Sequence, residues 1–392
     1  MKFSAIVCEF NPFHYGHKKI LSAAASKKLP VVCIMSGNFV QRGEAAIIDK
    51  WSRTEMALEN GADLVIELPL PWAVSSAQRF ALGSIQLLNS LGINGYLFFG
   101  SESGNIKVLS CLAEFLLSDS FSQNLQSHIN TGITFAAARE QAVSCILGAS
   151  YANTIHSPNN ILAVEYIKAI LETNSKLSPQ TIRRVGAKHD ENAAAGEISS
   201  ASEIRSMLKN GKSIAEKVPQ STYRITEELT CKGKCPALMD SLEIAILAKL
   251  RQMSADDFSR LPDISEGLEY RLFNASRTSC SLNEFIDTVK TKRYTHARIR
   301  RLVLSAFLNI DSSVPDNPQY IRILGMTSAG GKLLHTLKNT LPIIIRKSSV
   351  DRLKPVPLSL FNLEAAADDL YALAVPNPSP CNLDYSTGLI KK

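Results

Sequence analysis

Residues 3 to 100 alternate short apolar runs with longer helical patterns, and this alternation restricts the possible folds of the chain more than any other feature. The apolar runs, which are of strand type, cover residues 3–8, 31–35, 63–68 and 96–100. Helical patterns between them cover residues 17–26, 48–60 and 76–91. Short strands that are apolar on both faces and are separated by helices form parallel sheets with right-handed crossovers. The sequence therefore predicts an α/β fold with a Rossmann-like parallel sheet.

Polar or glycine-rich residues follow each of these predicted strands. The runs are followed in turn by two histidines at 14 and 17, by Ser36-Gly37-Asn38, by Pro69 with Pro71, and by Gly100-Ser101-Glu102. Ligands of parallel sheets bind at the carboxyl ends of the strands. We therefore expect the functional site along this edge of the sheet, on loops that a rigid scaffold positions.

The turn after the first strand contains two imidazoles within the stretch Phe13-His14-Tyr15-Gly16-His17. Gly16 allows close approach of the backbone, and the first N–H groups of the following helix can face an anion. Histidine, any residue, glycine and histidine in this setting resemble the nucleotidyltransferase signature, in which both histidines contact the phosphates of a nucleotide. We therefore predict that His14 and His17 are catalytic and hold phosphates. The alternative is a pair of surface histidines around a turn glycine.

Nucleotidyl transfer also needs a second anion site, because pyrophosphate leaves when an acceptor attacks the α-phosphate. The segment Ile198-Ser199-Ser200, with Arg205 one turn later, offers hydroxyl groups, first-turn N–H groups and a cation. Ser200 and Glu203 have the spacing of a capping box, which predicts that a helix starts here. An ordinary capped helix is the alternative. The segment resembles the second nucleotidyltransferase signature, two serines followed shortly by an arginine. Its position after the histidine turn is the order that this resemblance implies, which favours a phosphate site formed by Ser199, Ser200 and Arg205.

The loop after the second strand, residues 36–44, is dense in polar and glycine residues. Such residues make a poor core and a good substrate-facing loop. We expect Lys50 or Arg42 to reach an anionic ligand. Asp49 is expected to cap the next helix, and Arg53 to pair with an acidic neighbour on the surface of that helix.

Basic residues gather near residue 295, with Tyr294 and His296 between them: Lys290, Lys292, Arg293, Arg298, Arg300 and Arg301. Cations interleaved with aromatic rings suit a phosphate backbone and stacked bases. The cluster therefore predicts contacts to nucleic acid through Lys292, Arg293, Arg298, Arg300 and Arg301. A solvated helix face is the alternative, because runs of charge are usually only that.

The length and composition fit a globular protein of more than one domain. The chain has 392 residues and a net charge of +7, and single cores rarely grow to that length. Residues 105–175 and 237–310 are expected to be mostly helical, with strands at 181–186 and 341–346 and a polar loop at 188–196. Residues 215–236 are the best linker candidate, so we place two domains at 1–215 and 216–392. The sequence contains no run of about 18 apolar residues that could span a bilayer, and its N-terminus lacks the pattern of a signal peptide. We therefore expect a cytoplasmic protein without a membrane partner.

The eight cysteines do not indicate a metal site. Most lie within apolar segments, as small buried side chains do in a reducing compartment. The spacing of Cys231 and Cys235 is one residue longer than that of a zinc knuckle, and no second pair of ligands lies at the expected distance. We therefore expect no bound structural metal.

Several longer phrases are more specific than the histidine turn, and together they resemble the bacterial tRNA(Met) cytidine acetate ligase family. The phrases lie at residues 9–17, 35–44, 49–51, 63–69, 157–162, 266–268, 292–301 and 320–325. The similarity runs from residue 1 to about residue 340. The tail after about residue 345 matches loosely, and its role stays open.

The resemblance implies a nucleotidyltransferase-like Rossmann domain followed by a helix-rich C-terminal domain that holds tRNA. It implies activation of acetate by ATP as acetyl-adenylate, with Mg²⁺ as counter-ion, followed by acetylation of the exocyclic amine of the wobble cytidine of elongator tRNA(Met). Carried over by position, the ATP site comprises Val7, Cys8, Glu9, Phe10, Asn11, Pro12, Phe13, His14, Tyr15, Gly16, His17, Lys18, Lys19, Ile20, Gly100, Asn159 and Arg184.

Two other functions use part of this set of motifs. An adenylyltransferase that makes a dinucleotide-type cofactor needs both phosphate motifs but not the basic C-terminal half, and fold analogy alone does not decide between substrates. A tRNA-binding protein with a degenerate ATP site would not need intact His14, Gly16 and His17. The ligase is the function that accounts for the phosphate motifs and the basic cluster together.

Overall fold

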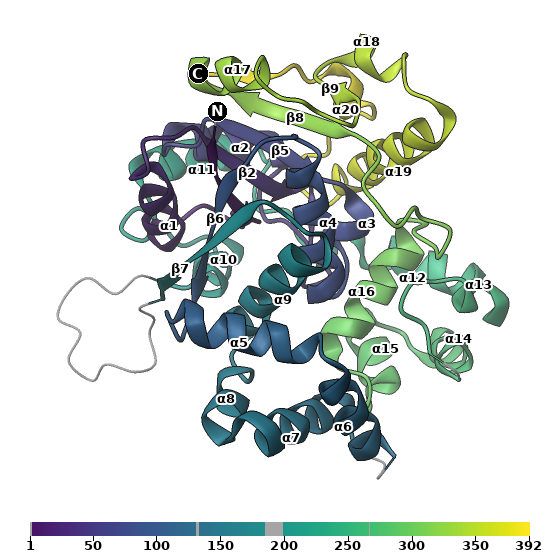
Figure 1. The fold of residues 1–392 in the computed structure, drawn as a ribbon. Helices are drawn as coiled ribbons and strands as arrows, with labels where there is room; N and C mark the ends of the chain where they lie inside the picture. The colour runs from purple at the N-terminus through teal and green to yellow at the C-terminus, as the bar shows by residue number, and fades with distance from the viewer. Residues whose placement is uncertain (1, 131–132, 185–198, 266) are drawn as a thin grey trace.

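The computed structural model describes residues 2–130, 133–184, 199–265 and 267–392. A mainly parallel sheet lies at its centre, with helices on both faces (Figure 1), so the predicted α/β class is confirmed. The strands of this sheet are β1 (Phe3–Cys8), β2 (Val31–Ser36), β5 (Leu64–Leu68), β6 (Gly95–Ser101), β7 (Leu177–Arg183), β8 (Ile321–Met326), β9 (Ile343–Ile344) and β10 (Ile390–Lys391). A separate two-stranded hairpin consists of β3 (Phe39–Val40) and β4 (Glu44–Ala45).

The order of the strands is β10-β8-β5-β2-β1-β6-β7, with β9 beside β8. The pairs are parallel except that β5 and β8 run antiparallel. In the centre, Ser4 of β1 lies opposite Val31 of β2 and Tyr96 of β6. The chain thus moves from β1 toward one edge and later returns to the other side of β1. Ligands of such sheets bind at this reversal, outside the carboxyl ends of the strands.

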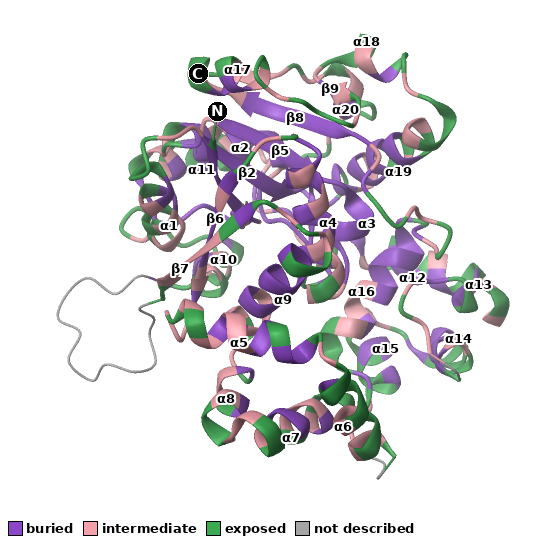
Figure 2. Ribbon diagram, in the orientation of Figure 1, coloured by how far each residue is buried: buried purple, intermediate pink, exposed green. Residues whose placement is uncertain are grey.

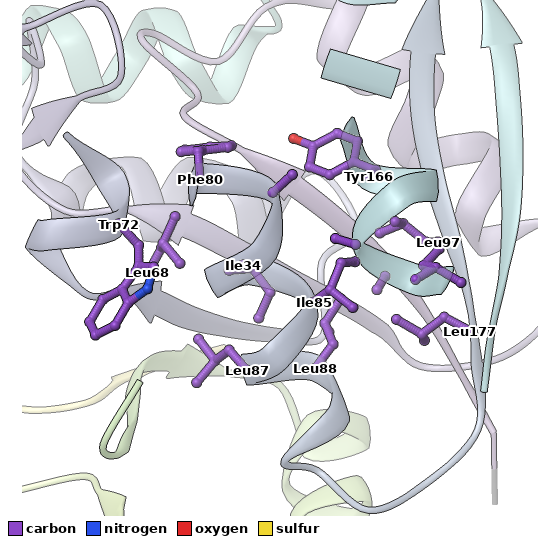
Figure 3. Packing of buried hydrophobic residues seen from close by; sticks show 14 of the residues in the cluster. Ile34, Leu68, Trp72, Phe80, Ile85, Leu87, Leu88, Leu97, Tyr166 and Leu177 are labelled. Carbon is purple, nitrogen blue, oxygen red and sulfur yellow. The ribbon is translucent and has the colours of Figure 1, made fainter. Parts of the chain in front are cut away.

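The central strands β1, β2 and β5 are mostly apolar on both sides because they face two layers of helices. One layer contains α4 (Ala77–Asn89), α5 (Ile106–Leu116) and α9 (Pro158–Glu172), and the other contains α1 (Tyr15–Ala25), α2 (Lys50–Glu59), α10 (Ala201–Lys209) and α11 (Gln220–Cys231). Within β2, Ile34 belongs to the first core and Cys33 to the second. Figure 3 shows Ile34 beside Ile85 and Leu88 of α4, and Figure 2 shows that the central strands are buried, whereas β7 at the edge is partly exposed.

The helices expected at residues 17–26, 48–60 and 76–91 are confirmed as α1, α2 and α4. Asp49 caps α2 by accepting a hydrogen bond from Ser52 N, as predicted. The mostly helical character expected for residues 105–175 is also confirmed. Besides α5 and α9, this part contains α6 (Asp119–Ile129), α7 (Phe135–Leu147) and α8 (Ala149–Thr154), while the short α3 (Leu70–Ala73) precedes α4.

A helical region with its own core lies beside the sheet (Figure 1). Its elements are the 3₁₀ helix η1 (Met239–Leu242), α12 (Glu243–Gln252), α13 (Ala255–Ser259), α14 (Leu268–Thr278), α15 (Leu282–Val289) and α16 (His296–Phe307). The helix α19 (Pro355–Tyr371) from the tail joins the same core. The helices expected at residues 237–310 are therefore confirmed.

The chain after residue 320 returns to the sheet, which a boundary at residue 215 did not anticipate. β8 pairs with β5 on one side and with β10 on the other. The tail also contains α17 (Ser328–Leu334), α18 (Lys347–Val350) and α20 (Leu383–Ser386). Residues 1–215 and 216–392 thus share one sheet. The six residues of β8 look like any apolar strand, and local sequence does not specify which sheet a strand joins.

Other expectations differ from the structure in their limits. The strand expected at residues 341–346 is reduced to Ile343–Ile344, and the linker candidate at 215–236 contains α11, whose Ile225 is buried. The strand expected at 181–186 is β7, and its last two residues lie outside the described part of the chain, as do the loop 188–196, Ile198 and Glu266. No described helix has the length and apolar character needed to cross a bilayer.

Candidate nucleotide-binding site

The turn between β1 and α1 rests on two buried aromatic rings. Phe10 and Phe13 meet edge to face, with 4.9 Å between their centroids, and both are buried. The ring of His17 lies 5.1 Å from that of Phe10. The rings of His14 and His17 stack on each other at 3.8 Å. The apolar residues of the signature therefore hold the two imidazoles in one place.

A reciprocal capping box fixes the orientation of both imidazoles. Nδ1 of His14 accepts a hydrogen bond from Gly16 N at 3.0 Å, and Nδ1 of His17 accepts one from His14 N at 3.3 Å. A neutral imidazole has one donor and one acceptor nitrogen. Because Nδ1 accepts in both rings, the proton of each neutral ring is on Nε2. Both histidines thus keep an Nε2–H group that the cap does not use and that can donate to phosphate oxygens.

Burial keeps both rings neutral at pH 7. Burial, together with the guanidinium groups of Arg184 and Arg205, lowers the pKa of His14 to about 4. Burial is the main cause that lowers the pKa of His17 well below its usual value, and electrostatic repulsion by His14 and Arg184 adds to it. The nearby guanidinium groups of Arg184 and Arg205, which disfavour an imidazolium, favour a bound anion.

The lowered pKa of His14 predicts a loss of stability in acid. Between about pH 6.5 and about pH 4 the unfolded chain binds a proton at His14 that the folded chain does not, so the free energy of unfolding falls as the pH falls. The shift corresponds to at most about 3 kcal/mol for this one residue. The free energy of unfolding, measured with urea across this pH range, should depend less steeply on pH in His14→Asn than in the unaltered protein. Asparagine keeps a capping side chain at this position. Equal slopes would contradict the assignment.

A cavity of about 260 Å³ opens at the carboxyl ends of β1 and β6, where the strand order reverses. Residues of the ATP site inferred from the sequence line this cavity: Val7, Cys8, Glu9, Phe10, His17, Ile20, Gly100, Asn159 and Arg184. The structure thus brings together residues from β1, α1, β6, α9 and the end of β7. This is the place where a doubly wound sheet binds ligands.

The absence of a side chain at Gly100 leaves room for the side chain of Arg184. A Cβ on Gly100 would lie 3.0 Å from Cγ of Arg184 and 3.3 Å from Cδ1 of Ile20, which is close for any contact. Glycine therefore leaves the room in which the Arg184 stem crosses the end of β6. The backbone N–H of Arg184 donates to Ser101 O at 2.9 Å and holds it there.

Asn159 is oriented by an acidic side chain at the start of α9. Its Nδ2 donates to Oε1 of Glu102 at 2.6 Å, and the backbone N–H of Asn160 donates to Oε2 at 2.8 Å. Glu102 thereby satisfies N–H groups at the start of the helix that would otherwise lack partners. The side-chain oxygen of Asn159 accepts no hydrogen bond from the described residues. It is available to a donor in the cavity.

The turn of the β3–β4 hairpin forms the polar edge of the cavity through Gln41 and Arg42. Oε1 of Glu9 accepts a hydrogen bond from Gln41 N at 2.8 Å, which ties the hairpin to the end of β1. Burial raises the pKa of Glu9, while the Gln41 hydrogen bond and Arg42 act in the opposite direction. Arg42 is therefore placed where the sequence analysis expected a cation to face a ligand.

The remaining residues of the stretch 7–20 shape the turn instead of lining the cavity: Asn11, Pro12, Phe13, His14, Tyr15, Gly16, Lys18 and Lys19. Asn11 accepts a hydrogen bond from Ile47 N at 2.8 Å, and His14 lies beneath His17. Lys18 and Lys19 are exposed on α1.

Lys50 does not reach an anionic ligand, contrary to one of the two expectations for this loop. Its side chain is 0% exposed. Its Nζ lies 2.8 Å from Glu67, 2.6 Å from Asp368 and 2.9 Å from Asp384. Two of these carboxylates come from the tail, so nothing near Lys50 in the sequence indicates them.

Arg53 is also buried, and it does not form the surface ion pair that was expected. Its guanidinium donates to the carbonyl oxygens of Glu9 at 2.5 Å, Ser36 at 3.0 Å and Gly37, while Nε donates to Ile48 O at 2.8 Å. The side chain thereby joins the loops after β1 and β2. Every residue has a main-chain carbonyl, so the sequence does not indicate which carbonyls Arg53 binds.

The second phosphate segment lies beside the histidine turn. Ser200 caps α10 by accepting from Glu203 N at 3.1 Å, which confirms the predicted helix start, and Ser199 is buried. Arg205 donates to Asn11 O at 3.0 Å and to Ser202 Oγ at 3.3 Å. Arg205 therefore stands against the outer side of the turn and does not line the 260 Å³ cavity.

The sequence analysis missed the apolar wall of the cavity. Ala77 and Phe80 of α4, Phe99 of β6, and Leu162 and Tyr166 of α9 line it. Figure 3 shows Phe80 and Tyr166 approaching each other from the two helices. These residues carry the ordinary pattern of buried helix faces, so a search for polar motifs does not single them out.

The basic cluster is divided by the structure. Lys292 and Arg293 are exposed before α16. Within the helix, Arg298 donates to Asp263 O at 2.5 Å, Arg300 pairs with Glu44 at 3.1 Å, and Arg301 is partly buried. The cluster therefore presents exposed cations at its start and a link to the β3–β4 hairpin further on. Across the described residues, no three His, Cys, Asp or Glu side chains are grouped to hold a metal ion.

Comparison with known proteins gives matches over nearly the whole chain. The family described as HIGH Nucleotidyl Transferase matches residues 1–385. The tRNA(Met) cytidine acetate ligase of Acetivibrio thermocellus is 36% identical over 97% of this chain and 96% of its own. That of Caldicellulosiruptor saccharolyticus is 40% identical over 95% of this chain and 94% of its own.

The crystal structure of Thermotoga maritima TmcAL bound with alpha-thio ATP has the same fold. Its TM-score is 0.91, with 32% identity and coverage of 100% of both chains. Matches of this length and identity confirm the resemblance inferred from the sequence phrases. The chain belongs to the HIGH nucleotidyl transferase family and, within it, to the tRNA(Met) cytidine acetate ligases.

Proposed function

We propose that this chain uses ATP to activate acetate as acetyl-adenylate and then acetylates the N4 amine of the wobble cytidine of elongator tRNA(Met). The observation that carries the proposal is the cavity at the β1–β6 reversal, which His17 and Arg184 line beside the capped histidine turn. Full-length relatives with the ligase name support the substrates. They do not favour a dinucleotide-forming adenylyltransferase. Because the acceptor is tRNA, we infer a cytoplasmic location.

Each polar group of the cavity has a role with ATP. The Nε2–H of His17 donates to a phosphate oxygen, and His14 beneath it keeps that ring in place. Arg184 pairs with a phosphate, while Gly100 and Asn159 contact the adenosine. Arg205, with the Ser199-Ser200 segment next to it, balances the charge of the departing pyrophosphate. Little covalent chemistry is required of the protein, so positioning and charge stabilisation supply the catalysis.

The residues present fit Mg²⁺ as a counter-ion to ATP. Glu9 contributes a carboxylate to the cavity, and one carboxylate combined with phosphate oxygens is a usual environment for Mg²⁺. When bound, the ion would neutralise phosphate charge during pyrophosphate release. The Gln41 N–H bond holds the Glu9 side chain at this edge.

The two chemical steps balance without a further reactant. A carboxylate oxygen of acetate attacks the α-phosphorus, the bond to the β-phosphate oxygen breaks, and pyrophosphate leaves. The cytidine amine then attacks the acetyl carbonyl, the bond to the AMP oxygen breaks, and the amine loses a proton. Bases of an anticodon loop are unpaired and can enter a cleft. Lys292, Arg293, Arg298, Arg300 and Arg301 provide the proposed tRNA surface.

Labelled ATP tests the function directly. With α-labelled ATP, the purified chain should form labelled acetyl-adenylate, with release of pyrophosphate, only when acetate is present. Adding elongator tRNA(Met) should release AMP and place the acetyl group on the tRNA. Acetate-independent transfer of AMP to another small acceptor would contradict the proposal and return the adenylyltransferase to consideration.

A further inference from the structure

A second cavity, of about 440 Å³, adjoins the β3–β4 hairpin, whose turn also borders the 260 Å³ cavity, which we call the nucleotide cavity. Gln41 and Arg42 of the hairpin turn line the first cavity, and the next two residues, Gly43 and Glu44, line the second. Arg205 also lines the second cavity, and it donates to Asn11 O in the histidine turn. The two cavities are thus neighbours that share the hairpin turn as a wall.

Close packing holds this wall against the basic helix. Gly43 has a φ of +76°, and a Cβ at this residue would lie 2.7 Å from the carbonyl carbon of Arg300 and 2.8 Å from Arg301 N. The hairpin turn therefore touches the backbone of α16 directly. The second cavity opens between the nucleotide site and the helix that carries part of the proposed tRNA surface.

The second cavity is lined by cations whose ion pairs are partly exposed to solvent. Lys209 Nζ lies 2.5 Å from Asp240, and their side chains are 52% and 71% exposed. Arg300 pairs with Glu44 at 3.1 Å in a less exposed pair. Exposed ion pairs contribute little to stability. Both cations can therefore turn toward a phosphate without a large cost to the fold.

Another part of the cavity lining is apolar. Met239, Leu282 and Ile286 line it, from η1 and α15. A base packs well against apolar side chains, whereas an inorganic anion gains nothing from them. Its volume also lies within the range of pockets that hold small ligands. Cations together with an apolar wall suit a nucleotide unit.

We propose that this second cavity binds one ribonucleotide of the acceptor RNA, beside the nucleotide that reacts in the first cavity. Its phosphate lies against Lys209 and Arg300, and its base packs on the wall formed by Met239, Leu282 and Ile286. This inference rests on the proposed function, because it takes RNA as the acceptor. It adds a site that holds the strand in register, so that the reactive base stays at the adenylate.

The test compares two changes in the second cavity with a matched control. Lys209→Ala removes a cation from the cavity, and Ser206→Trp fills it from an exposed position on α10 that lines it. Lys212→Ala removes an equal charge from an exposed position outside the lining. Lys292→Ala with Arg293→Ala serves as a positive control on the proposed tRNA surface.

Affinity for a labelled elongator tRNA(Met) transcript is measured by fluorescence anisotropy over a range of salt concentrations. Lys209→Ala should weaken binding about five- to tenfold and lower the slope of log affinity against log salt by about one, as expected for one lost phosphate contact. Ser206→Trp should weaken binding at least about tenfold, because the indole ring would occupy the space in which the base packs. Lys212→Ala should change affinity less than about twofold, because Lys212 does not line the cavity and its exposed charge is screened by salt.

A second measurement separates this inference from the proposed function. Acetate-dependent exchange of pyrophosphate into ATP reports adenylate formation without RNA, and it should be unchanged in both cavity variants. Absence of exchange in the unaltered chain would contradict the proposed function. The tRNA affinities of the variants do not depend on the exchange activity, so they test the second cavity separately. Wild-type tRNA affinity in Lys209→Ala and Ser206→Trp, or an equal loss in Lys212→Ala, would overturn the second nucleotide site.

Discussion

Replacing His17 with alanine is expected to slow acetyl-adenylate formation by about 10²- to 10³-fold, the usual effect of removing one preorganised donor from a developing charge. His17 is the histidine whose ring lines the nucleotide cavity, and its Nδ1 is occupied by the His14 N–H. Only the Nε2–H is left to donate to phosphate. Single-turnover formation of labelled acetyl-adenylate measures the effect, which should appear in the rate more than in the affinity for ATP.

His14 variants separate positioning from folding. His14→Ala removes both the cap acceptor for Gly16 N and the ring that stacks on His17, so adenylate formation should also fall strongly. His14→Asn keeps a good capping side chain and should restore stability but not the rate. Ser22→Ala, an exposed change on the same helix, is the control. Full activity in His17→Ala would show that the histidine turn does not act on phosphate.

Replacing Lys50 with methionine is expected to lower the free energy of unfolding by about 3–5 kcal/mol, the effect of removing one partner from a buried ion pair. Three carboxylates lie within 3.0 Å of its Nζ, and all are buried. The variant leaves Glu67, Asp368 and Asp384 without that cation, while Arg322 still pairs with Asp384 at 3.2 Å. Urea unfolding followed by circular dichroism measures the loss.

Lys209→Met provides the comparison for Lys50→Met, because Lys209 pairs with Asp240 on the surface. That change should cost less than about 1 kcal/mol. A loss of the same small size in Lys50→Met would contradict the assignment of the buried cluster. The cluster also gives the tail a role, because Asp368 in α19 and Asp384 in α20 bind a lysine at the start of α2. Asp368 further accepts from Asn38 Nδ2 at 2.9 Å, next to the hairpin that borders the nucleotide cavity.

Local sequence patterns predicted the central strands because their physical causes are local. β1, β2, β5 and β6 lie within one residue of the limits expected from apolar runs, and α1, α2 and α4 follow the helical patterns between them. The histidine turn was predicted for the same reason, since its capping box joins residues only three positions apart. The residues Gly100, Asn159 and Arg184 were predicted as part of the ATP site in another way, from the resemblance to a family.

The residues that were misplaced have partners far away along the chain. Lys50 looked like a ligand-facing cation because Asp368 and Asp384 are more than three hundred positions later. Arg53 looked like a surface residue because its partners are backbone carbonyls. The segment of β8 was assigned to a separate domain because its neighbour β5 lies near the other end of the sequence.

Sequence alone was enough for the class of fold, the capped histidine turn and the family, because apolar periodicity, helix caps and motif spacing are short-range properties. Packing was needed to decide which cations line the cavity and which are buried in the core. It placed Arg42 at the nucleotide cavity and Lys50 among three carboxylates, although only eight positions separate them. A charge belongs to a site or to a core according to what surrounds it, and for these residues the surroundings are assembled from α19, α20 and the β3–β4 hairpin.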